Sequence, residues 1–403
     1  MTTPLAIDGG PPVRTQPWPS WPVWDDRELQ ALTDTLRSGA WAAIGGTQVH
    51  ALEQEFALAH GARHGIACAS GSAALEVALR AAGIDWGDEV LTTAYTFIAT
   101  ANACLLLGAL PRFADVLPGT WNIDPESVRR RITPRTRAIV AVHIAGEPAD
   151  MDALRQIARE HSLPLIEDSA QAHGARWRGQ PVGSMGDMGT FSFQISKNMN
   201  AGEGGMVLSN SDAYAERCWS IVNVGRQREG AFYHHAGLSG NYRLPEWPAA
   251  VLRVQLQRLE EQSARRSENA AYLFDAVDEV PGLTPVRGDA RVTQFAHHLV
   301  RFMYAPEQFN GRPPQDFVRA MIAEGIPIQQ GYPIPLSRHP VVVERSAFIR
   351  TRLGMPQEAP DRCPVCEKVC AQGLWLPQWV LLADYRAMDD IVRAAQRIQQ
   401  AWA

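Results

Sequence analysis

Through the first half of the chain, short apolar runs alternate with stretches in which apolar residues recur every three or four positions. SAALEVALRAAG (72–83) and PADMDALRQIAREHS (148–162) have this second pattern, which predicts amphipathic helices. The apolar runs are of strand length: HGIACAS (64–70), DEVLTTA (88–94), LPRFADV (110–116), AIVAVHIAG (138–146) and LPLIEDSA (163–170). Apolar strands that alternate with helices are typical of a mostly parallel sheet covered on both faces. The pattern therefore predicts an α/β fold.

The pattern changes after about residue 210. Residues 225–243 are polar and contain glycine, which predicts a loop, and residues 245–277 predict one long helix that starts near Pro245. A second α+β region follows, with a strand at 297–304 and an amphipathic helix at 388–403. The first residues are rich in Pro, Gly and Trp and predict an arm on the surface. We therefore predict three parts: an arm (1–20), a large domain (21–255) and a smaller C-terminal domain (256–403).

Length and charge limit the classes of function. The chain has 403 residues, of which 46% are hydrophobic, and a net charge of −5. That is enough chain for two cores, and it lacks the basic face or stripe that nucleic-acid binding needs. The N-terminus has no signal-peptide pattern, and no apolar run reaches the roughly 18 residues of a membrane span. We therefore expect a cytoplasmic protein without nucleic-acid or membrane partners.

Six cysteines are spread over this long chain, which is not the density of a disulfide-stabilised fold. Three of them, Cys363, Cys366 and Cys370, recur at the spacing of one helix face. A zinc site would need a fourth cysteine or histidine at short spacing, and the sequence has none there. We therefore predict buried thiols on a helix and no metal centre.

Two turns that follow predicted strands carry candidate binding groups. The Gly71–Ser72 turn opens a helix, so backbone N–H groups, a hydroxyl and the helix dipole converge there, as they do around a bound phosphate. Phe97 follows the next strand and offers a flat ring to a planar ligand. Taken alone, the first is an ordinary helix N-cap and the second an ordinary core residue.

Asp168 and Lys197 are the charged candidates. Asp168 ends an apolar strand, so its carboxylate is expected to be partly buried and to need a partner, although an Asx turn would also explain it. A lysine held in a dry pocket has a lowered pKa and can form a Schiff base, whereas alone Lys197 is better explained as a surface residue. A phosphate cradle, a flat ring, an acid and such a lysine together fit pyridoxal phosphate, whose ring nitrogen the acid would keep protonated.

Longer motifs contain these residues: SGSAALEVAL (70–79), TFIATANA (96–103), IEDSAQAHGARWRG (166–179), SFQISKNMNAGEGG (192–205) and GNYRLPEWPAAVLRVQL (240–256). Through these motifs, from about residue 15 to the C-terminus, the chain resembles the DegT/DnrJ/StrS family of sugar aminotransferases, within fold type I of the pyridoxal phosphate enzymes. The resemblance implies a large domain with a seven-stranded, mostly parallel sheet and a smaller C-terminal domain. It also implies a homodimer with shared active sites.

The resemblance gives individual residues a role. Lys197 is implied to form the Schiff base and then to move the proton at the substrate carbon, and Asp168 to pair with the pyridine nitrogen. Asn241 is implied to reach the phosphate of the neighbouring subunit, and His173 lies near the cofactor without a defined role. The other implied cofactor contacts are Gln171 near the ring hydroxyl, Phe97 on the ring face, and Gly71, Ser72 and Ser192 at the phosphate.

Two segments narrow the resemblance to one branch. Gln194 and LWLPQWVLLA (374–383) are similar to members that aminate cyclitols such as scyllo-inosose, or that make 3-amino-5-hydroxybenzoate. This branch implies L-glutamine or L-glutamate as amino donor and a keto-cyclitol or keto-sugar as acceptor, in specialised, antibiotic-type metabolism. Tyr233, His234 and Tyr332 are candidates for contacts with the acceptor.

Two alternatives stay open at this point. One is a synthase that dehydrates and aromatises an amino-dehydroshikimate on the same lysine and consumes no amino donor. The other is a catalytically silent regulator that binds pyridoxal phosphate. The intact lysine, aspartate and phosphate cradle argue against the regulator, because a silent binder has no need of a Schiff base.

Overall fold

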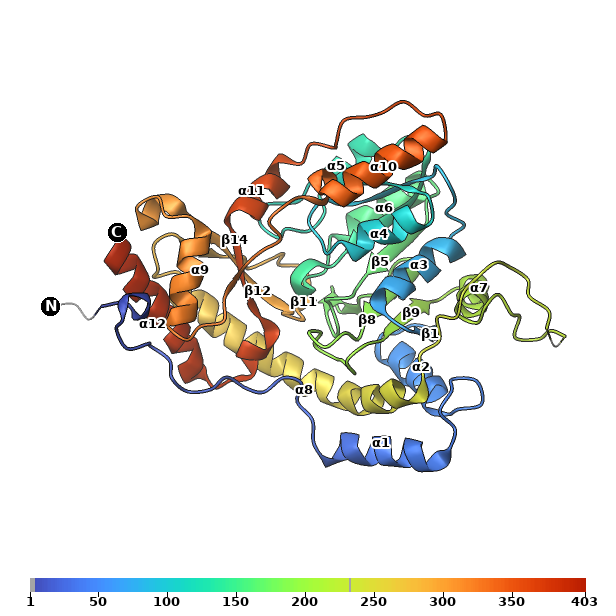
Figure 1. Cartoon of the computed structure of the whole chain (residues 1–403), viewed down its shortest axis with the longest axis horizontal. Helices are drawn as coiled ribbons and strands as arrows, with labels where there is room; N and C mark the ends of the chain where they lie inside the picture. Colours follow the sequence, from blue (N-terminus) through green and yellow to red (C-terminus); the bar gives the residue numbers. More distant parts are fainter. Residues whose placement is uncertain (1–3, 232) are drawn as a thin grey trace.

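A seven-stranded sheet forms the centre of the large domain. The structure, a computed structural model, describes residues 4–231 and 233–403. The strand order is β1-β9-β8-β5-β4-β2-β3, and six of these strands run parallel while β9 runs the opposite way. Figure 1 labels β1, β9, β8 and β5 of this sheet. The strands are β1 (His64–Cys68), β2 (Glu89–Thr93), β3 (Leu110–Ala114), β4 (Thr136–Val142), β5 (Leu165–Asp168), β8 (Met188–Ser192) and β9 (Gly205–Ser209). The predicted mostly parallel α/β fold is confirmed.

Helices cover both faces of this sheet. On one face α3 (Gly71–Ala81), α4 (Ala99–Leu106) and α7 (Asp212–Val222) share an apolar core with the strands. On the other face α5 (Pro125–Arg131) and α6 (Met151–Glu160) do the same. Strands β2, β5, β8 and β9 are buried along their whole length, which explains why they lack the apolar–polar alternation of a half-exposed strand.

The C-terminal part builds its own core on a four-stranded antiparallel sheet with the order β10-β12-β14-β13. Its elements are β10 (Leu283–Pro285), β12 (Leu299–Tyr304), β13 (Gln329–Gln330), β14 (Gly373–Pro377), α9 (Pro314–Ala323) and α12 (Tyr385–Trp402). A small third sheet of β6 (Arg176–Trp177), β7 (Gln180–Pro181) and β11 (Val292–Gln294) pairs a segment of the large domain with one that follows α8. The expected second α+β region is present.

One long helix, α8 (Glu246–Val277), runs beneath both parts (Figure 1). Its first half packs against α1 (Asp26–Ser38) and α2 (Gln48–Ala59), and its second half packs against α12 and the 3-10 turn at Gln378–Leu382. The helix predicted over 245–277 is confirmed. Because α8 passes residue 255 without a break, the boundary between 255 and 256 stays a prediction.

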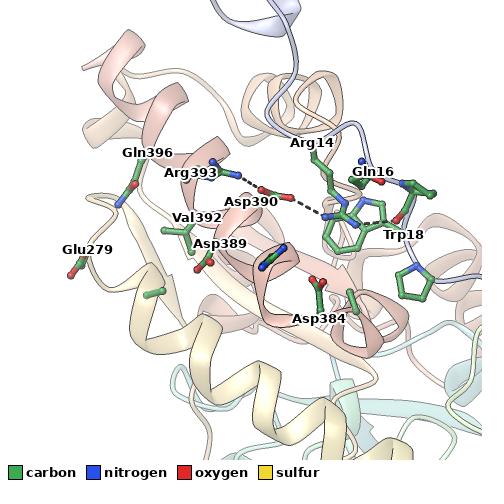
Figure 2. Close-up of a pocket in the computed structure, with 15 residues that line it drawn as sticks. Arg14, Gln16, Trp18, Glu279, Asp384, Asp389, Asp390, Val392, Arg393 and Gln396 are labelled. Carbon is green, nitrogen blue, oxygen red and sulfur yellow. Dashed lines mark hydrogen bonds and ion pairs between the residues drawn. The ribbon is translucent and has the colours of Figure 1, made fainter.

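The N-terminal arm lies along the small domain. Leu5 is buried in the core of that domain, and the ring of Trp18 packs edge-on against Trp379 with 6.2 Å between centroids. Figure 2 shows Arg14 of the arm paired with Asp390 of α12 (2.9 Å), across an open groove between the two segments. Residues 1–3 of the predicted arm lie outside the described residues.

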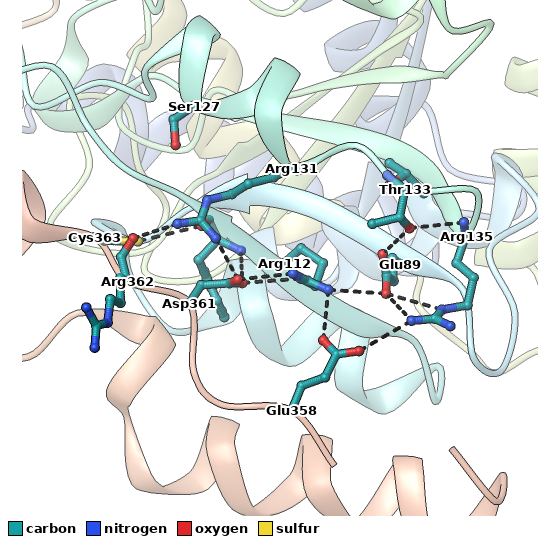
Figure 3. A network of polar contacts seen from close by, with 12 residues as sticks. Glu89, Arg112, Ser127, Arg131, Thr133, Arg135, Glu358, Asp361, Arg362 and Cys363 are labelled. Atoms are coloured by element: carbon teal, nitrogen blue, oxygen red, sulfur yellow. Dashed lines mark hydrogen bonds and ion pairs between the residues drawn. The ribbon is translucent and has the colours of Figure 1, made fainter. Parts of the chain in front are cut away.

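A segment of the C-terminal part returns to the large domain. α10 (Pro340–Arg352) packs on α4, and residues 353–363, here called the strap, follow it. Asp361 of the strap accepts hydrogen bonds from Arg112 (3.1 Å) and Arg131 (2.6 Å) of the large domain (Figure 3). The hydrophobic pattern does not predict α10 or this attachment, because both depend on contacts between segments that are distant in sequence.

Two residues of the cysteine cluster, Cys366 and Cys370, lie on the helix α11 (Pro364–Gln372), and Cys363 immediately precedes it. Cys363, Cys366 and Cys370 are buried, which confirms the predicted thiols, and the Sγ atoms of Cys366 and Cys370 are 3.9 Å apart. Within the described residues, no group of three or more His, Cys, Asp or Glu side chains is arranged to hold a metal ion. In the same part of the chain, no helix combines the length and the apolar character needed to cross a bilayer.

Candidate active site

A cavity of about 660 Å³ lies where the carboxyl ends of the central strands meet the small domain. Val142, Asp168 and Ser192, the last residues of β4, β5 and β8, line it, and so do Ser72, at the start of α3, and Phe97, in the turn after β2. Open α/β sheets bind their ligands at this edge. The opposite wall comes from the small domain: His298, Leu299, Gln329, Tyr332, Trp375 and Gln378.

The turn between β1 and α3 forms the predicted phosphate cradle. Ser70 caps α3, and its Oγ accepts a hydrogen bond from the N–H of Ala73 (3.1 Å). A side chain at Gly71 would place its Cβ 2.5 Å from the Cβ of Ser192, so the turn needs glycine to approach the end of β8. This approach brings the hydroxyls of Ser72 and Ser192 and the first N–H groups of α3 to one part of the cavity, as phosphate binding requires.

Lys197 stands in the turn that joins β8 to β9. Backbone hydrogen bonds from Ile195 to Gly202 (2.9 Å) and from Lys197 to Gln194 (2.9 Å) close this turn and hold the lysine at the carboxyl end of β8. The side chain is half-buried and lines the cavity, and burial lowers its pKa to about 8, against the opposing charge of Asp168. About one tenth of the amine is then neutral at pH 7 and able to act as nucleophile or base.

Asp168 is almost fully buried at the end of β5. One carboxylate oxygen accepts a hydrogen bond from the Thr100 hydroxyl (2.8 Å) and the other from the N–H of Ala170 (3.2 Å). Burial raises the pKa of Asp168, and the Thr100 hydroxyl, the Ala170 N–H and the Lys197 charge each oppose the rise. A carboxylate fixed in such surroundings calls for a cationic partner, which a protonated ring nitrogen would supply.

Gln171 and Phe97 provide two further contacts for a planar ligand. The Gln171 side chain donates to the Tyr332 hydroxyl (3.3 Å) and accepts from the N–H of Ala145 (2.6 Å), so it links the two walls of the cavity. Burial raises the pKa of Tyr332 to about 12, which keeps its hydroxyl protonated. Phe97 is 57% exposed although it lines the cavity, and an open ring at this place fits a stacking face rather than a core residue.

Three predicted residues lie elsewhere. Asn241, Tyr233 and His234 belong to the loop at 225–243, and none of them is among the described residues that line this chain's cavity. Tyr233 and Asn241 are exposed. Contacts of these residues with cofactor or acceptor would have to form in the cavity of a partner subunit, and they stay predictions.

Two buried histidines lie close to Lys197. His173 is buried and packs against the rings of Phe191 and Phe193, and burial keeps its pKa well below the ordinary value. His298 lines the cavity, and its Nδ1 is 3.1 Å from the Oδ1 of Asn198, whose amide nitrogen donates to the carbonyl of Ala296 (2.6 Å). The bond to Ala296 fixes the orientation of the Asn198 amide, so its oxygen faces His298. Nδ1 of His298 therefore carries the proton and donates it, and Nε2 is an acceptor. Burial and the Lys197 charge keep the pKa of His298 low and the ring neutral.

The hydrophobic pattern does not single out Trp21, His298 or Gln378, although each lines the cavity. Trp21 and Gln378 stand in segments rich in Trp, Pro and Leu, and His298 directly precedes a strand. In each segment the hydrophobic pattern is therefore that of core residues. Their place depends on how the small domain folds against the large one. The one local signal is a polar residue inside an apolar run, as Gln378 is in LWLPQWVLLA.

The lowered pKa of Lys197 predicts how pH controls cofactor uptake. The neutral amine is the form that attacks a carbonyl, and with a pKa of about 8 its fraction rises about tenfold per pH unit below pH 8 and then levels off. We expect the rate at which cofactor-free protein takes up pyridoxal phosphate, followed by absorbance, to show this curve. Lys368 is exposed and is the only other lysine in the chain. The measurement is therefore made on the Lys368→Arg variant, in which Lys197 is the only lysine. A rate that keeps rising to pH 10 would contradict the assignment.

Known proteins are similar to this chain in sequence and in fold. The profile of the DegT/DnrJ/EryC1/StrS aminotransferase family matches residues 22–396. The chain is 37% identical to an L-glutamine:2-deoxy-scyllo-inosose aminotransferase of Streptoalloteichus tenebrarius, over 99% of this chain and 98% of that protein. It is 38% identical to a 3-amino-5-hydroxybenzoate synthase of Amycolatopsis mediterranei, over 91% and 93%. The solved structure of a 3-amino-5-hydroxybenzoic acid synthase superposes with a TM-score of 0.87 at 35% identity, over 96% of this chain and 99% of that one.

Proposed function

This chain belongs to the DegT/DnrJ/EryC1/StrS aminotransferase family, and on that basis we propose that it transfers the amino group of L-glutamine, or of L-glutamate, to a keto-cyclitol or keto-sugar. It is a pyridoxal phosphate-dependent aminotransferase of fold type I. The observation that carries the proposal is the presence of Lys197, with its lowered pKa, and of buried Asp168 in one cavity with a phosphate cradle.

Each cavity residue has a task in this reaction. Bound here, pyridoxal phosphate supplies an electron sink for the negative charge that develops at the substrate carbon. We assign Lys197 Nζ to hold the cofactor and then to move the proton at that carbon. Asp168 holds the proton on the ring nitrogen, and Phe97 covers one ring face. The hydroxyls of Ser72 and Ser192 bind the phosphate together with the N–H groups at the start of α3. Gly71 and Gln171 complete the set of cofactor contacts.

The acceptor class follows from the small-domain wall and from the relatives. A keto-cyclitol presents several ring hydroxyls, each of which donates and accepts hydrogen bonds. His298 offers an acceptor nitrogen and Tyr332 a protonated hydroxyl to such a ring. The relative from Streptoalloteichus tenebrarius is named for L-glutamine and 2-deoxy-scyllo-inosose, which supports this donor and this acceptor class, in specialised metabolism of the antibiotic type.

We also propose a homodimer in which each subunit completes the other's cavity. Asn241 lies outside the cavity of its own chain, as expected of a residue that serves a neighbour's phosphate site. Tyr233 and His234 lie in the same loop and would reach the neighbour's acceptor. Large apolar side chains are exposed on and around α1 and support an interface there: Trp24, Leu29, Leu36, Trp41 and Ile44. Sedimentation at micromolar concentration tests this, and a monomer that turns over would contradict it.

The cytoplasm is the proposed location. All six cysteines are free thiols, the state that is typical of reducing compartments. Fractionation of the producing cells, with the protein followed by antibody, tests the proposal, and recovery outside the cytoplasm would overturn it.

A donor and acceptor screen tests the function directly. Adding L-glutamine to the protein with bound pyridoxal phosphate, which should be yellow, should shift the visible absorbance of the cofactor. A keto-cyclitol such as scyllo-inosose or 2-deoxy-scyllo-inosose should restore the original absorbance. A nucleotide-linked keto sugar serves as the comparison acceptor. Turnover that consumes no donor would favour the synthase alternative. A protein that binds the cofactor and responds to no donor would favour the silent regulator.

A further inference from the structure

A buried guanidinium lies behind the small-domain wall of the cavity. Arg266 of α8 is fully buried, and its hydrogen bonds go to amide oxygens. Nε and Nη2 donate to Oε1 of Gln378 (2.9 and 2.7 Å), and Nη2 also donates to Oε1 of Gln262 (3.2 Å). Nη1 has no hydrogen-bond partner in the described part of the chain. A buried cation is normally paired with an anion, because neutral oxygens replace only part of its hydration.

The groups around Arg266 do not cancel its charge. Three buried histidines lie near it: His173, His297 and His298. Burial lowers the pKa of each, and the Arg266 charge lowers it further, so the three rings are neutral. The indole of Trp21 covers the guanidinium, with Cζ 5.6 Å from the ring centroid, and Trp21 itself lines the cavity. An aromatic face stabilises a cation by less than a buried charge requires.

Gln378 connects this charge to the cavity. Its side chain is 1% exposed, it lines the cavity, and its backbone N–H donates to the carbonyl of His298 (3.1 Å). Both guanidinium bonds end on Oε1, which settles the orientation of the amide and leaves Nε2 on the other branch. Nε2 is buried and has no partner in the described residues. The guanidinium polarises this NH₂ group and makes it a stronger donor.

The charges of the cavity indicate which acceptor this donor would bind. The described residues that line it include one cation, Lys197, two carboxylates, Asp168 and Glu203, and no arginine. An amino-acid donor brings an α-carboxylate next to the carbon at which Lys197 works, and both cavity carboxylates repel it. We infer that the Gln378 amide, held and polarised by Arg266, binds the carboxylate of the amino donor. The inference rests on the proposed function, because the proposed donor is what carries this group.

Three variants and one control test the inference on the holoenzyme. Gln378→Leu removes the donor group, and Arg266→Met removes the charge behind it. Gln378→Glu gives Arg266 the anion that it lacks, so this variant should keep its melting temperature, while its carboxylate repels that of the donor. Gln262→Met removes the other amide on Arg266 but leaves both bonds to Gln378, and should bind like the wild type.

Two measurements separate this subsite from the activity as a whole. The first is the dissociation constant of glutaramate, which is glutamine without its amino group and therefore cannot react. The second is the rate of the donor-driven absorbance change with L-glutamine, compared with 4-aminobutanamide, which is glutamine without its carboxylate. A hydrogen bond to a charged group is worth about 1.5–3 kcal/mol, so Gln378→Leu should weaken the binding of both glutaramate and L-glutamine about 10- to 100-fold. The rate with 4-aminobutanamide should not fall.

The outcomes distinguish failure of the inference from failure of the proposed function. If the wild type reacts with no amino acid, the proposed function fails, while glutaramate binding still decides the subsite. If Gln378→Glu binds glutaramate as tightly as the wild type does, the subsite is overturned even in an active aminotransferase. Loss of pyridoxal phosphate affinity in Arg266→Met, with glutaramate binding unchanged, would assign the charge to the cofactor and would also overturn the inference.

Discussion

Lys197→Ala should abolish the absorbance change that L-glutamine causes in the wild type, and turnover should fall by about 10²–10⁴-fold, the usual contribution of a positioned general acid/base. The variant lacks the amine that holds the cofactor and moves the proton at the substrate carbon. The measurement is the visible spectrum before and after the donor is added. Borohydride reduction followed by peptide mass analysis should find the cofactor attached at residue 197 of the wild type and at no residue of the variant.

The chain offers an unusually clean control for this experiment. Lys197 and Lys368 are its only two lysines, and Lys368 is exposed on α11. Lys368→Arg should therefore keep the full absorbance change. Mixing Lys197→Ala with Asn241→Leu extends the test, because a hybrid dimer with shared sites contains one cavity that has both native residues. Substantial turnover by Lys197→Ala alone would sink the assignment, and no recovery on mixing would sink the shared site.

Asp168→Asn should be the next most damaging change. The neutral amide cannot hold a proton on the ring nitrogen, so turnover should drop by about 10²–10³-fold, as when one preorganised electrostatic group is removed elsewhere. Affinity for pyridoxal phosphate should fall about 10- to 100-fold, since a hydrogen bond between charged groups is lost. Titration of the cofactor into cofactor-free protein measures the affinity, and initial rates at saturating cofactor measure the turnover.

Glu167, the neighbour of Asp168 on β5, is the matched control. Its buried carboxylate lies 3.0 Å from Nε2 of His143 and accepts backbone N–H bonds from Gly183, Met185 and Gly186, outside the cavity lining. Glu167→Gln should lower the melting temperature and leave the rate per bound cofactor unchanged. If the Asp168 variant instead loses only stability, with affinity and rate intact, its role at the ring nitrogen is wrong.

Local signals in the sequence predict most elements that hold the site. α1 begins after the capping box of Asp25 and ends at Gly39, and α8 begins after Pro245, because caps depend on neighbours in the chain. The same holds for the site residues that follow strands. Ser72 and Lys197 come to one cavity because the ends of parallel strands share one edge of the sheet.

Contacts between distant segments account for what the sequence does not predict. The reversed direction of β9 and the existence of α10 give no local signal. Thr100, which orients the Asp168 carboxylate, stands in a short, mostly apolar helix that carries no pattern typical of a site. Gln378 has one local signal, its place as a polar residue in an apolar run, but its bond to Arg266 depends on α8, which supplies that residue from 112 positions away in sequence.

The small domain is attached to the large one at several separated places, among them α8, the small sheet of β6, β7 and β11, and Asp361 of the strap. A hinge rotation that opened the cavity would bend a continuous helix or break the ion pairs of Arg112 and Arg131. The structure therefore favours a cavity of fixed shape over one that opens and closes by a hinge motion of the two domains. On this geometry, donor and acceptor would enter and leave one preshaped space in turn, past exposed side chains such as Phe97.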